Sequence, residues 1–298
     1  MPAAAKPWAR RAPVTRHPSP VFCAPLSDRY TVAMTSNELH LLDRVVIGLV
    51  ETSLPENIGA AARAMKVMGL SRLVLVAPRL FPDTRANALA AGADQVLDQA
   101  IVAAALGEAL PDCQFMLGCT ARLRGVELPA FTPREAAQRL LSEAQTGTVA
   151  VWFGSERVGL SNADLGRCHG AIQIASDPEF SSLNLAQAVQ IIAYELRLAA
   201  LAGAEAGAEP VQVQAPRPLD RPANLAEMER YFAHLQAALG TIDFLKGRSS
   251  RVIMLRLRRM YLRAQPSLRE LNILHGILSE AERQSRIATR LSAADPGN

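Results

Sequence analysis

Short apolar runs alternate along the chain with segments whose apolar residues recur every three or four positions. Runs typical of buried strands lie at 44–50, 73–76, 115–119, 149–153 and 171–174. Helical spacing predicts helices at 57–68, near 100–110, and at 133–144, 162–167 and 184–201. Strands that alternate with helices favour an α/β fold, in which a mostly parallel sheet is covered by helices on both faces.

The pattern changes near residue 203. The next twenty or so positions are rich in small residues and proline, which is typical of a linker. Beyond them, apolar spacing predicts three helices, near 224–239, 249–263 and 267–287. Two of these helices begin with the spacing of a capping box, Asn224 to Glu227 and Ser267 to Glu270. We therefore expect a small all-helical domain after the linker.

The chain divides into four predicted parts. The first 40 residues are rich in Ala, Pro and Arg without periodicity, which predicts a disordered leader, and Met34 is an alternative start. The expected parts are this leader at 1–40, an α/β domain at 41–203, a linker at 204–222 and a basic helical domain at 223–292.

The net charge of +4 conceals an uneven distribution. Residues 41–203 carry 13 Lys and Arg against 16 Asp and Glu, whereas residues 223–292 carry 12 against 6. The basic C-terminal part predicts a polyanionic partner, and a solvated basic face is the alternative.

Composition argues against several classes of protein. An apolar content of 49% supports a sizeable core, and the chain has no run of 18 apolar residues that would predict a membrane span. The four cysteines lack C-x-x-C spacing and the five histidines lack metal-ligand spacing. We therefore expect no metal site and no disulfide framework, and a reducing, cytoplasmic setting.

Three loops that follow predicted strands carry the candidate chemistry, because ligands of open α/β sheets bind at the carboxyl ends of the strands. The first loop leads into a helix with Asn57 and, one and a half turns further, Arg63. The second, at 153–165, has two glycines that permit close approach of the backbone to a ligand, with Glu156 between them. The alternatives are a surface salt bridge for Arg63 and a solvated carboxylate for Glu156.

The third loop, at 176–184, precedes a long apolar helix. It places Ser181, Ser182 and Asn184 where the first N–H groups of that helix lack backbone partners. Side chains of these types are favoured as helix caps, and the same position can also hold a polar ligand. The residue pattern leaves both interpretations open.

Motifs of other enzyme classes are missing. The chain has neither the glycine fingerprint of dinucleotide-binding folds nor a phosphate-binding P-loop. It also lacks the nucleophile elbow of α/β hydrolases. Cys168 and His169 are sequence neighbours at a helix end, so their side chains diverge, which argues against a Cys–His nucleophile.

Three stretches together point to a known family. They are NIGAAARAM at 57–65, FGSERVGL at 153–160 and PEFSSLNLAQAV at 178–189. They resemble the three motifs of the SpoU branch of the SPOUT RNA methyltransferases. The YELR stretch and the basic helical tail are similar to one bacterial subgroup, which methylates tRNA, so that the resemblance extends over about residues 41–290.

The resemblance implies a SPOUT-type trefoil knot, a homodimer and S-adenosyl-L-methionine as the methyl donor. By motif position the cofactor contacts would be Cys119, Thr120, Ala121, Gly154, Ile174, Ser181, Ser182 and Leu183. The family usually has Thr-Ser-Ala where this chain has Cys-Thr-Ala. Contacts through the backbone would be kept, whereas a contact through the first hydroxyl would be lost.

The resemblance also implies an activity, the methylation of the ribose 2′-hydroxyl of cytidine or uridine 32 in the tRNA anticodon loop. Arg63 would be the central catalytic residue, reaching into the partner's cofactor site and stabilising the 2′-oxyanion. Asn57 and Glu156 would fix the loop geometry, and Ser182 would form a hydrogen bond at the reacting centre or to the cofactor carboxylate.

The tRNA is expected on an arginine cluster of the helical domain. Its members are Arg248, Arg251, Arg256, Arg258, Arg259 and Arg263. Two alternatives stay open: a SpoU-type enzyme that acts on another tRNA or rRNA site, and a non-catalytic RNA-binding protein.

Overall fold

The computed structural model describes residues 40–121, 128–179, 181–205, 217–246 and 249–294. The predicted leader up to residue 39, residues 206–216 of the predicted linker, and Arg248 lie outside the described residues.

Seven parallel strands form one sheet in the order β3-β2-β1-β6-β4-β7-β5. The strands are β1 (Val45–Val50), β2 (Arg72–Val76), β3 (Ile101–Ala103), β4 (Cys113–Cys119), β5 (Ala130–Phe131), β6 (Thr148–Phe153) and β7 (Gly170–Ile172). The five predicted strands are confirmed as β1, β2, β4, β6 and β7. The edge strands β3 and β5 are too short to show a period in the sequence and were not predicted; they are strands because they pair with β2 and β7.

The helices of the sheet domain are α2 (Pro55–Val67), α3 (Thr84–Ala90), α4 (Asp94–Asp98), α5 (Leu106–Ala109), α6 (Pro133–Ala144), α7 (Asn162–Leu165) and α8 (Leu185–Glu205), after a short 3₁₀ turn, η2 (Leu42–Arg44). The helix predicted near 100–110 is wrong in its first half, because Ile101 and Val102 pair with β2 and only 106–109 are helical. The pattern gave no prediction of α3 and α4, which are short.

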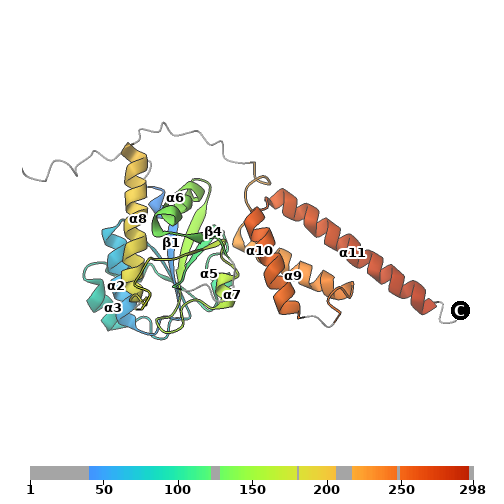
Figure 1. Ribbon diagram of the computed structural model, residues 1–298, viewed down its shortest axis with the longest axis horizontal. Helices are drawn as coiled ribbons and strands as arrows, with labels where there is room; N and C mark the ends of the chain where they lie inside the picture. The colour runs from blue at the N-terminus through green and yellow to red at the C-terminus, as the bar shows by residue number, and fades with distance from the viewer. Residues whose placement is uncertain (1–39, 122–127, 180, 206–216, 247–248, 295–298) are drawn as a thin grey trace, which may run out of the picture. The chain divides into compact units, whose positions relative to one another are not determined.

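Helices cover both faces of the sheet, as predicted. Side chains of β1 alternate between two apolar layers: Ile47 and Leu49 pack with α2, α6 and α8, whereas Val46 and Val50 pack in the layer that contains α5 and α7. Figure 1 shows α2, α3 and α8 on one side of the strands and α5 and α7 on the other. The α/β fold class is therefore confirmed, and the trefoil knot stays a prediction.

Helix α8 is a core helix of this domain. By length and composition alone, Leu185–Gly203 could cross a membrane. However, Val189, Ile192 and Leu196 are fully buried, and the helix packs along both α2 and α6. A buried helix of a folded domain passes the same test, so its length and apolarity are accounted for by packing.

The three C-terminal helices are confirmed as α9 (Leu225–Thr241), α10 (Ser250–Ala264) and α11 (Leu268–Ala294). They share a separate apolar cluster centred on Tyr231, Phe232 and Leu235. Both predicted capping boxes are present at the starts of α9 and α11. The chain therefore carries a small all-helical part after the sheet domain, as expected.

Candidate functional site

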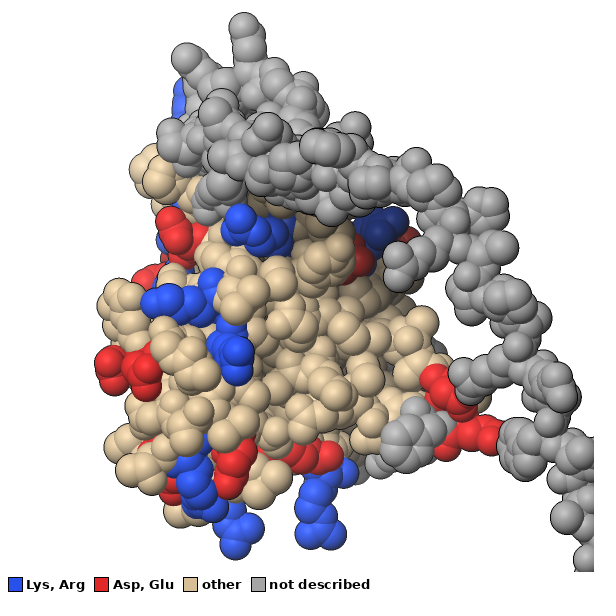
Figure 2. Space-filling model, turned by 90° about the vertical axis from the view of Figure 1, so that its left-hand side faces the viewer, with Lys and Arg blue, Asp and Glu red and all other residues tan. Residues whose placement is uncertain are grey.

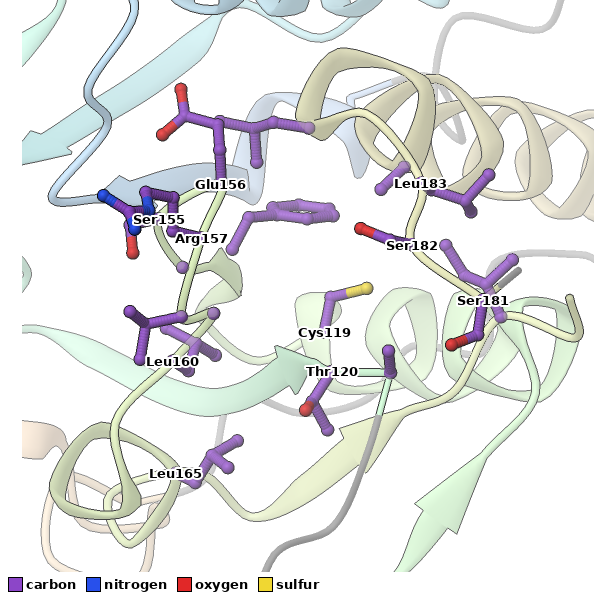
Figure 3. A pocket seen from close by; sticks show the side chains of 18 of the residues that line it. Cys119, Thr120, Ser155, Glu156, Arg157, Leu160, Leu165, Ser181, Ser182 and Leu183 are labelled. Carbon is purple, nitrogen blue, oxygen red and sulfur yellow. The ribbon is translucent and has the colours of Figure 1, made fainter. Parts of the chain in front are cut away.

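A cavity of about 370 Å³ lies at the carboxyl edge of the sheet, where β6, β4 and β7 end. These strands are consecutive in the sheet, so three loops that are distant in sequence meet there. All eight residues proposed above as cofactor contacts line this cavity: Cys119, Thr120, Ala121, Gly154, Ile174, Ser181, Ser182 and Leu183. Figure 3 labels five of them, Cys119, Thr120, Ser181, Ser182 and Leu183.

The wall of the cavity is part apolar and part polar. Its apolar members, Phe153, Leu160, Leu165 and Ala188, were not predicted as site residues because they have the spacing of ordinary core residues. For Phe153 and Leu160, the position directly beside Gly154 and Gly159 was the available signal. A large flat organic group can lie against such a wall while hydroxyl and backbone groups fix its orientation.

The two glycines of the second loop allow the loop to fold back on itself. The N–H of Gly159, at φ +72°, donates to the carbonyl of Ser155 at 2.9 Å. A Cβ atom on Gly154 would lie 1.9 Å from the carbonyl carbon of Gly159. The space next to Gly154 is therefore filled by its own loop, a different reason for glycine from the close approach of a ligand that the sequence suggested.

Glu156 connects the second loop to the first. Its carboxylate accepts hydrogen bonds from Ser53, through both N at 3.0 Å and Oγ at 2.7 Å, and from the N–H of Leu54 at 3.2 Å. Ser53 donates to Oε2, whereas Nδ2 of Asn57 donates at 2.8 Å to Oε1, the oxygen that also accepts from Leu54. Figure 3 shows the carboxylate turned away from the cavity. Glu156 thus accepts hydrogen bonds from the first loop and is not a solvated carboxylate.

These contacts keep Glu156 ionised. Partial burial by itself raises the pKa of this carboxyl, but the hydrogen bonds from Asn57 and Ser53 outweigh burial and lower the pKa to about 2. Because Glu156 stays ionised at every physiological pH, it cannot donate a proton. The side chain therefore holds the two loops together and takes no part in acid catalysis.

Asn57 also reaches the third loop. Nδ2 of Asn184 donates to Oδ1 of Asn57 at 3.0 Å, while Oδ1 of Asn184 accepts from the N–H of Ala186 at 2.9 Å. Asn184 is thus the helix cap that the sequence allowed, and it is also a link that sequence analysis did not assign. Ser181 and Ser182 line the cavity instead.

Cys119 ends β4 at the floor of the cavity. In Figure 3 its thiol and the hydroxyl of Ser182 point into the same space. Burial raises the pKa of the thiol to about 12, so Cys119 is a neutral, weakly polar wall residue and not a nucleophile. Among the described residues, no group of three His, Cys, Asp or Glu side chains is placed to hold a metal ion.

Arg63 lies outside this cavity. It is exposed on α2, and among the described residues it makes neither a hydrogen bond nor an ion pair. The surface salt bridge considered from the sequence is therefore not formed in this part of the chain. The structure brings Asn57, Glu156 and Ser182 to the site, whereas Arg63 is not among the residues that line the cavity.

The arginines of the C-terminal part separate into different environments. Arg258 forms a two-bonded ion pair with Glu229 and stacks on Phe232 at 4.2 Å, so it stabilises the helical part. Arg251 is exposed. The other three described members, Arg256, Arg259 and Arg263, line a second cavity.

Two family models cover most of the chain. Residues 44–194 match the SpoU rRNA Methylase family, and residues 226–290 match the C-terminal domain of the tRNA methyltransferase TrmJ. The chain belongs to the SpoU methylase family. It is a methyltransferase, and its methyl donor is S-adenosyl-L-methionine, as in that family.

Relatives extend the match beyond the family domain. The tRNA (cytidine/uridine-2′-O-)-methyltransferase TrmJ of Pectobacterium atrosepticum is 45% identical over 243 residues, which are 82% of this chain and 98% of that protein. The protein of the same name from Escherichia coli K12 is 44% identical over 246 residues, 83% of this chain and 98% of that protein.

Solved structures of similar proteins agree with the fold. The crystal structure of TrmJ from Z. mobilis ZM4 superposes with a TM-score of 0.68 at 38% identity, over 80% of this chain and 98% of that one. A probable methylase family protein from Haemophilus influenzae Rd KW20 gives a TM-score of 0.53 at 37% identity, over 83% and 99% of the two chains.

Proposed function

We propose that this protein methylates the 2′-oxygen of cytidine or uridine 32 in the anticodon loop of tRNA, as a cytoplasmic homodimer. One observation carries the proposal: the loops after β4, β6 and β7 converge on a single cavity, and Asn57 at the start of α2 links the loop after β6 to the loop after β7. Relatives named tRNA (cytidine/uridine-2′-O-)-methyltransferase, identical at 44–45% of positions, support the choice of substrate.

The cavity fits the methyl donor. Its volume of about 370 Å³ is within the range of pockets that hold small cofactors. Apolar side chains such as Ile174 and Leu160 offer a surface for the adenine ring, and the hydroxyls of Ser181 and Ser182 offer hydrogen bonds to the ribose and amino-acid portions. The thiol of Cys119 forms no strong hydrogen bond, so the backbone of the loop after β4 has to supply the polar contacts to the cofactor there.

The chain's own residues have to activate a poor nucleophile. Bound S-adenosyl-L-methionine supplies a methyl group that its positive sulfur makes electrophilic. The ribose hydroxyl is a very weak acid, so the protein has to position it and stabilise the charge that develops as its proton leaves. Ser182, exposed at the edge of the cavity, is placed to form a hydrogen bond there.

Arg63 is the proposed source of that charge stabilisation. A guanidinium stays protonated and does not act as a base, but it holds a phosphate and a developing oxyanion through two parallel hydrogen bonds. Its exposure, and the absence of a polar partner among the described residues, leave it available to a second subunit. We therefore assign Arg63 to the cofactor cavity of the partner.

The dimer face we propose is the outer surface of α2 and α8, which pack together. It exposes large apolar side chains: Val67 is 62% exposed on α2, four residues from Arg63, and Tyr194 is 49% exposed on α8. Figure 2 shows a broad uncharged area on the side of the molecule where α2, α3 and α8 lie, with charged side chains around it. An apolar area with a polar rim is the usual character of a subunit interface.

We also propose a division of the chain into two functional domains. We take 41–203 as the methyltransferase domain and 223–292 as a domain that contributes to tRNA binding. The match of 226–290 to the TrmJ C-terminal domain, together with the excess of basic residues there, supports this role.

The direct test incubates the full chain with tRNA and methyl-labelled cofactor and locates the labelled nucleotide by mass spectrometry. The proposal predicts one labelled ribose, at position 32. A tRNA with a 2′-deoxyribose at that position is the matched control, and it should take no label.

Ribosomal RNA is tested as a substrate in the same experiment, because residues 44–194 match the SpoU rRNA Methylase family. Label in rRNA, or at another tRNA position, would replace the proposed substrate while keeping the reaction. Absence of transfer to any RNA, with the cofactor still bound, would favour a non-catalytic RNA-binding protein.

A further inference from the structure

Helix α11 exposes large apolar side chains on a different side from the one that packs on α9. The packed side holds Leu271, Leu274 and Leu278, which belong to the apolar cluster of the helical part. Among the described residues of α11, the exposed large apolar side chains are Ile273 (60% exposed), Ile277 (59%), Ile287 (37%) and Leu291 (66%). Apolar side chains that follow one another along a helix face in water mark a surface for another helix.

These four residues belong to a stripe with the spacing of a coiled coil. Consecutive members of the stripe are four, three, four, three and four residues apart, which is the a/d spacing of a heptad repeat. The α11 stripe consists of Ile273, Ile277, Glu280, Gln284, Ile287 and Leu291. Its two polar members are exposed and stand in the middle. The face therefore matches one side of a two-helix coiled coil.

The α11 stripe reads the same in both directions. From either end it runs apolar, apolar, polar, polar, apolar, apolar, with identical spacings. Two antiparallel copies of α11 around a two-fold axis would set Ile273 against Leu291 of the partner subunit, and Ile277 against Ile287 of the partner subunit. A two-fold interface has to be self-complementary in this way, because both subunits contribute the same surface.

Charge at the centre of the stripe favours the antiparallel arrangement. Glu280 accepts hydrogen bonds from Arg283 at 2.8 and 2.7 Å and from Gln284 at 2.8 Å, and these bonds lower its pKa to about 2. A parallel pair would set this carboxylate against its own copy, where like charges repel. An antiparallel pair sets it against the amide of Gln284 and close to the guanidinium of Arg283 in the other chain, so opposite charges meet at the axis.

We propose that α11 pairs antiparallel with α11 of a second copy of this chain through the α11 stripe. The surface is small, with four large apolar side chains from each helix, which gives weak association between proteins that meet free in solution. Subunits already joined elsewhere are at a high effective concentration, so a second contact forms readily between them. The inference therefore rests on the homodimer of the proposed function and assigns both contacts to the same dimer.

Engineered cysteines in the full chain test the register. In the antiparallel pair position 277 faces position 287 of the other chain, so the oxidised double variant I277C/I287C should form disulfide-linked dimers. Within one chain these positions are about 15 Å apart along the helix, which is too far for a disulfide. The single variants I277C and I287C are the matched controls, because each cysteine then faces an isoleucine. Neither should cross-link above the background of wild type.

Two results of this experiment would overturn the proposal. Cross-linked dimers from I277C alone would show that the helices pair in parallel. A level of cross-linking in I277C/I287C equal to the wild-type background would show that they do not pair. An equimolar mixture of the two single variants, in which subunits exchange before oxidation, should join I277C chains to I287C chains.

Sedimentation equilibrium measures what the stripe contributes to the dimer. I277K/I287K sets lysine against lysine in the antiparallel pair, and N272K/S279K adds the same charge at exposed positions of α11 outside the stripe. We expect the dimer dissociation constant to rise at least about tenfold in the first variant and less than about threefold in the second. Equal changes would assign the effect to net charge and overturn the proposal. A wild-type mass of four chains that falls to two in I277K/I287K would place the contact between dimers and contradict its assignment to one dimer.

Methyl transfer by the same preparations separates this inference from the proposed function. If wild type is a dimer that methylates tRNA and I277C/I287C does not cross-link, only the pairing of α11 fails. If I277C/I287C cross-links and wild type transfers no methyl group to tRNA, the proposed reaction fails and the pairing stands. Circular dichroism of I277K/I287K checks that the helices are intact, and the cysteine variants, which add no charge, keep the test open if they are not.

Discussion

Nδ2 of Asn57 lies 2.8 Å from Oε1 of Glu156, although the two residues are 99 positions apart in the sequence. The same amide accepts a hydrogen bond from Asn184 through Oδ1. One side chain at the start of α2 therefore connects the loop after β6 with the loop before α8. Both of these loops line the cavity proposed for the cofactor, so the shape of that cavity depends on the hydrogen bonds of Asn57, which is not itself a lining residue.

Replacing Glu156 by Gln tests that dependence. Gln keeps the size of the side chain, but its NH₂ group faces donors, so Asn57 or Ser53 loses an acceptor. An unsatisfied donor costs about 1 to 3 kcal/mol, which predicts cofactor binding about tenfold to a hundredfold weaker. Isothermal titration with S-adenosyl-L-methionine measures the change.

Glu135→Gln is the matched control. Glu135 also accepts hydrogen bonds from a neighbouring backbone and hydroxyl, in the capping box of α6, and those bonds likewise lower its pKa. It does not line the cofactor cavity. We expect unchanged cofactor affinity for this variant. Affinity within twofold of wild type for Glu156→Gln would remove the carboxylate from the account of the site.

Gly154→Ala tests the folded second loop. The new methyl group would lie 2.1 Å from the backbone N of Leu160, and a backbone atom cannot move aside without shifting the loop. We expect a lower Tm and loss of measurable cofactor binding. Gly240→Ala on α9 meets no atom within 4 Å and should leave Tm unchanged or raise it, because Ala favours helix by about 1 kcal/mol. Normal binding by Gly154→Ala would show that the loop has another conformation.

His169 predicts a pH dependence of stability. Burial, with a smaller contribution from Arg139 in the same direction, lowers the pKa of this histidine to about 4. The unfolded chain therefore takes up a proton that the folded chain resists. Stability is fully present above the ordinary pKa of 6.5 and declines as the pH falls from there toward 4, by up to about 3 kcal/mol.

Urea unfolding of wild type and His169→Gln near pH 7 and near pH 5 measures this effect. Gln can still accept the hydrogen bond from Met116, but it does not titrate. We expect wild type to lose more stability than the variant on acidification. His275, whose pKa is also lowered by burial, contributes equally to both proteins and cancels in the comparison. Equal losses in the two proteins would show that His169 takes up a proton in the folded state.

The sequence predicted the sheet domain well where period and burial agree. The parallel strands β1, β2, β4 and β6 read as apolar runs because both of their faces are buried. Ile101 was misread as helical because the run IVAAAL suits a helix as well as a strand, and only the pairing of β3 with β2 decides between them. Local pattern carries no information on such a pairing.

The site was predicted in part. The motif positions that line the cavity, from Cys119 to Leu183, were identified through their resemblance to a family. The roles of Ser53 and Asn184 were not, because each depends on a partner more than 100 positions away. Arg258 and Arg256 also differ in environment, because Arg258 pairs with Glu229 of α9. The spacing of residues along α10 does not reveal that partner.

The central claim is that a guanidinium from one subunit completes the cavity of the other. Its most direct test is a purified heterodimer of two inactive variants, Arg63→Ala and Ser182→Trp, carrying different affinity tags. Tryptophan at position 182 fills one cavity but leaves Arg63 of that subunit intact, so the other cavity regains every proposed group. The account predicts methyl transfer to tRNA at about half the wild-type rate per dimer. A heterodimer as inactive as its two parents would contradict it.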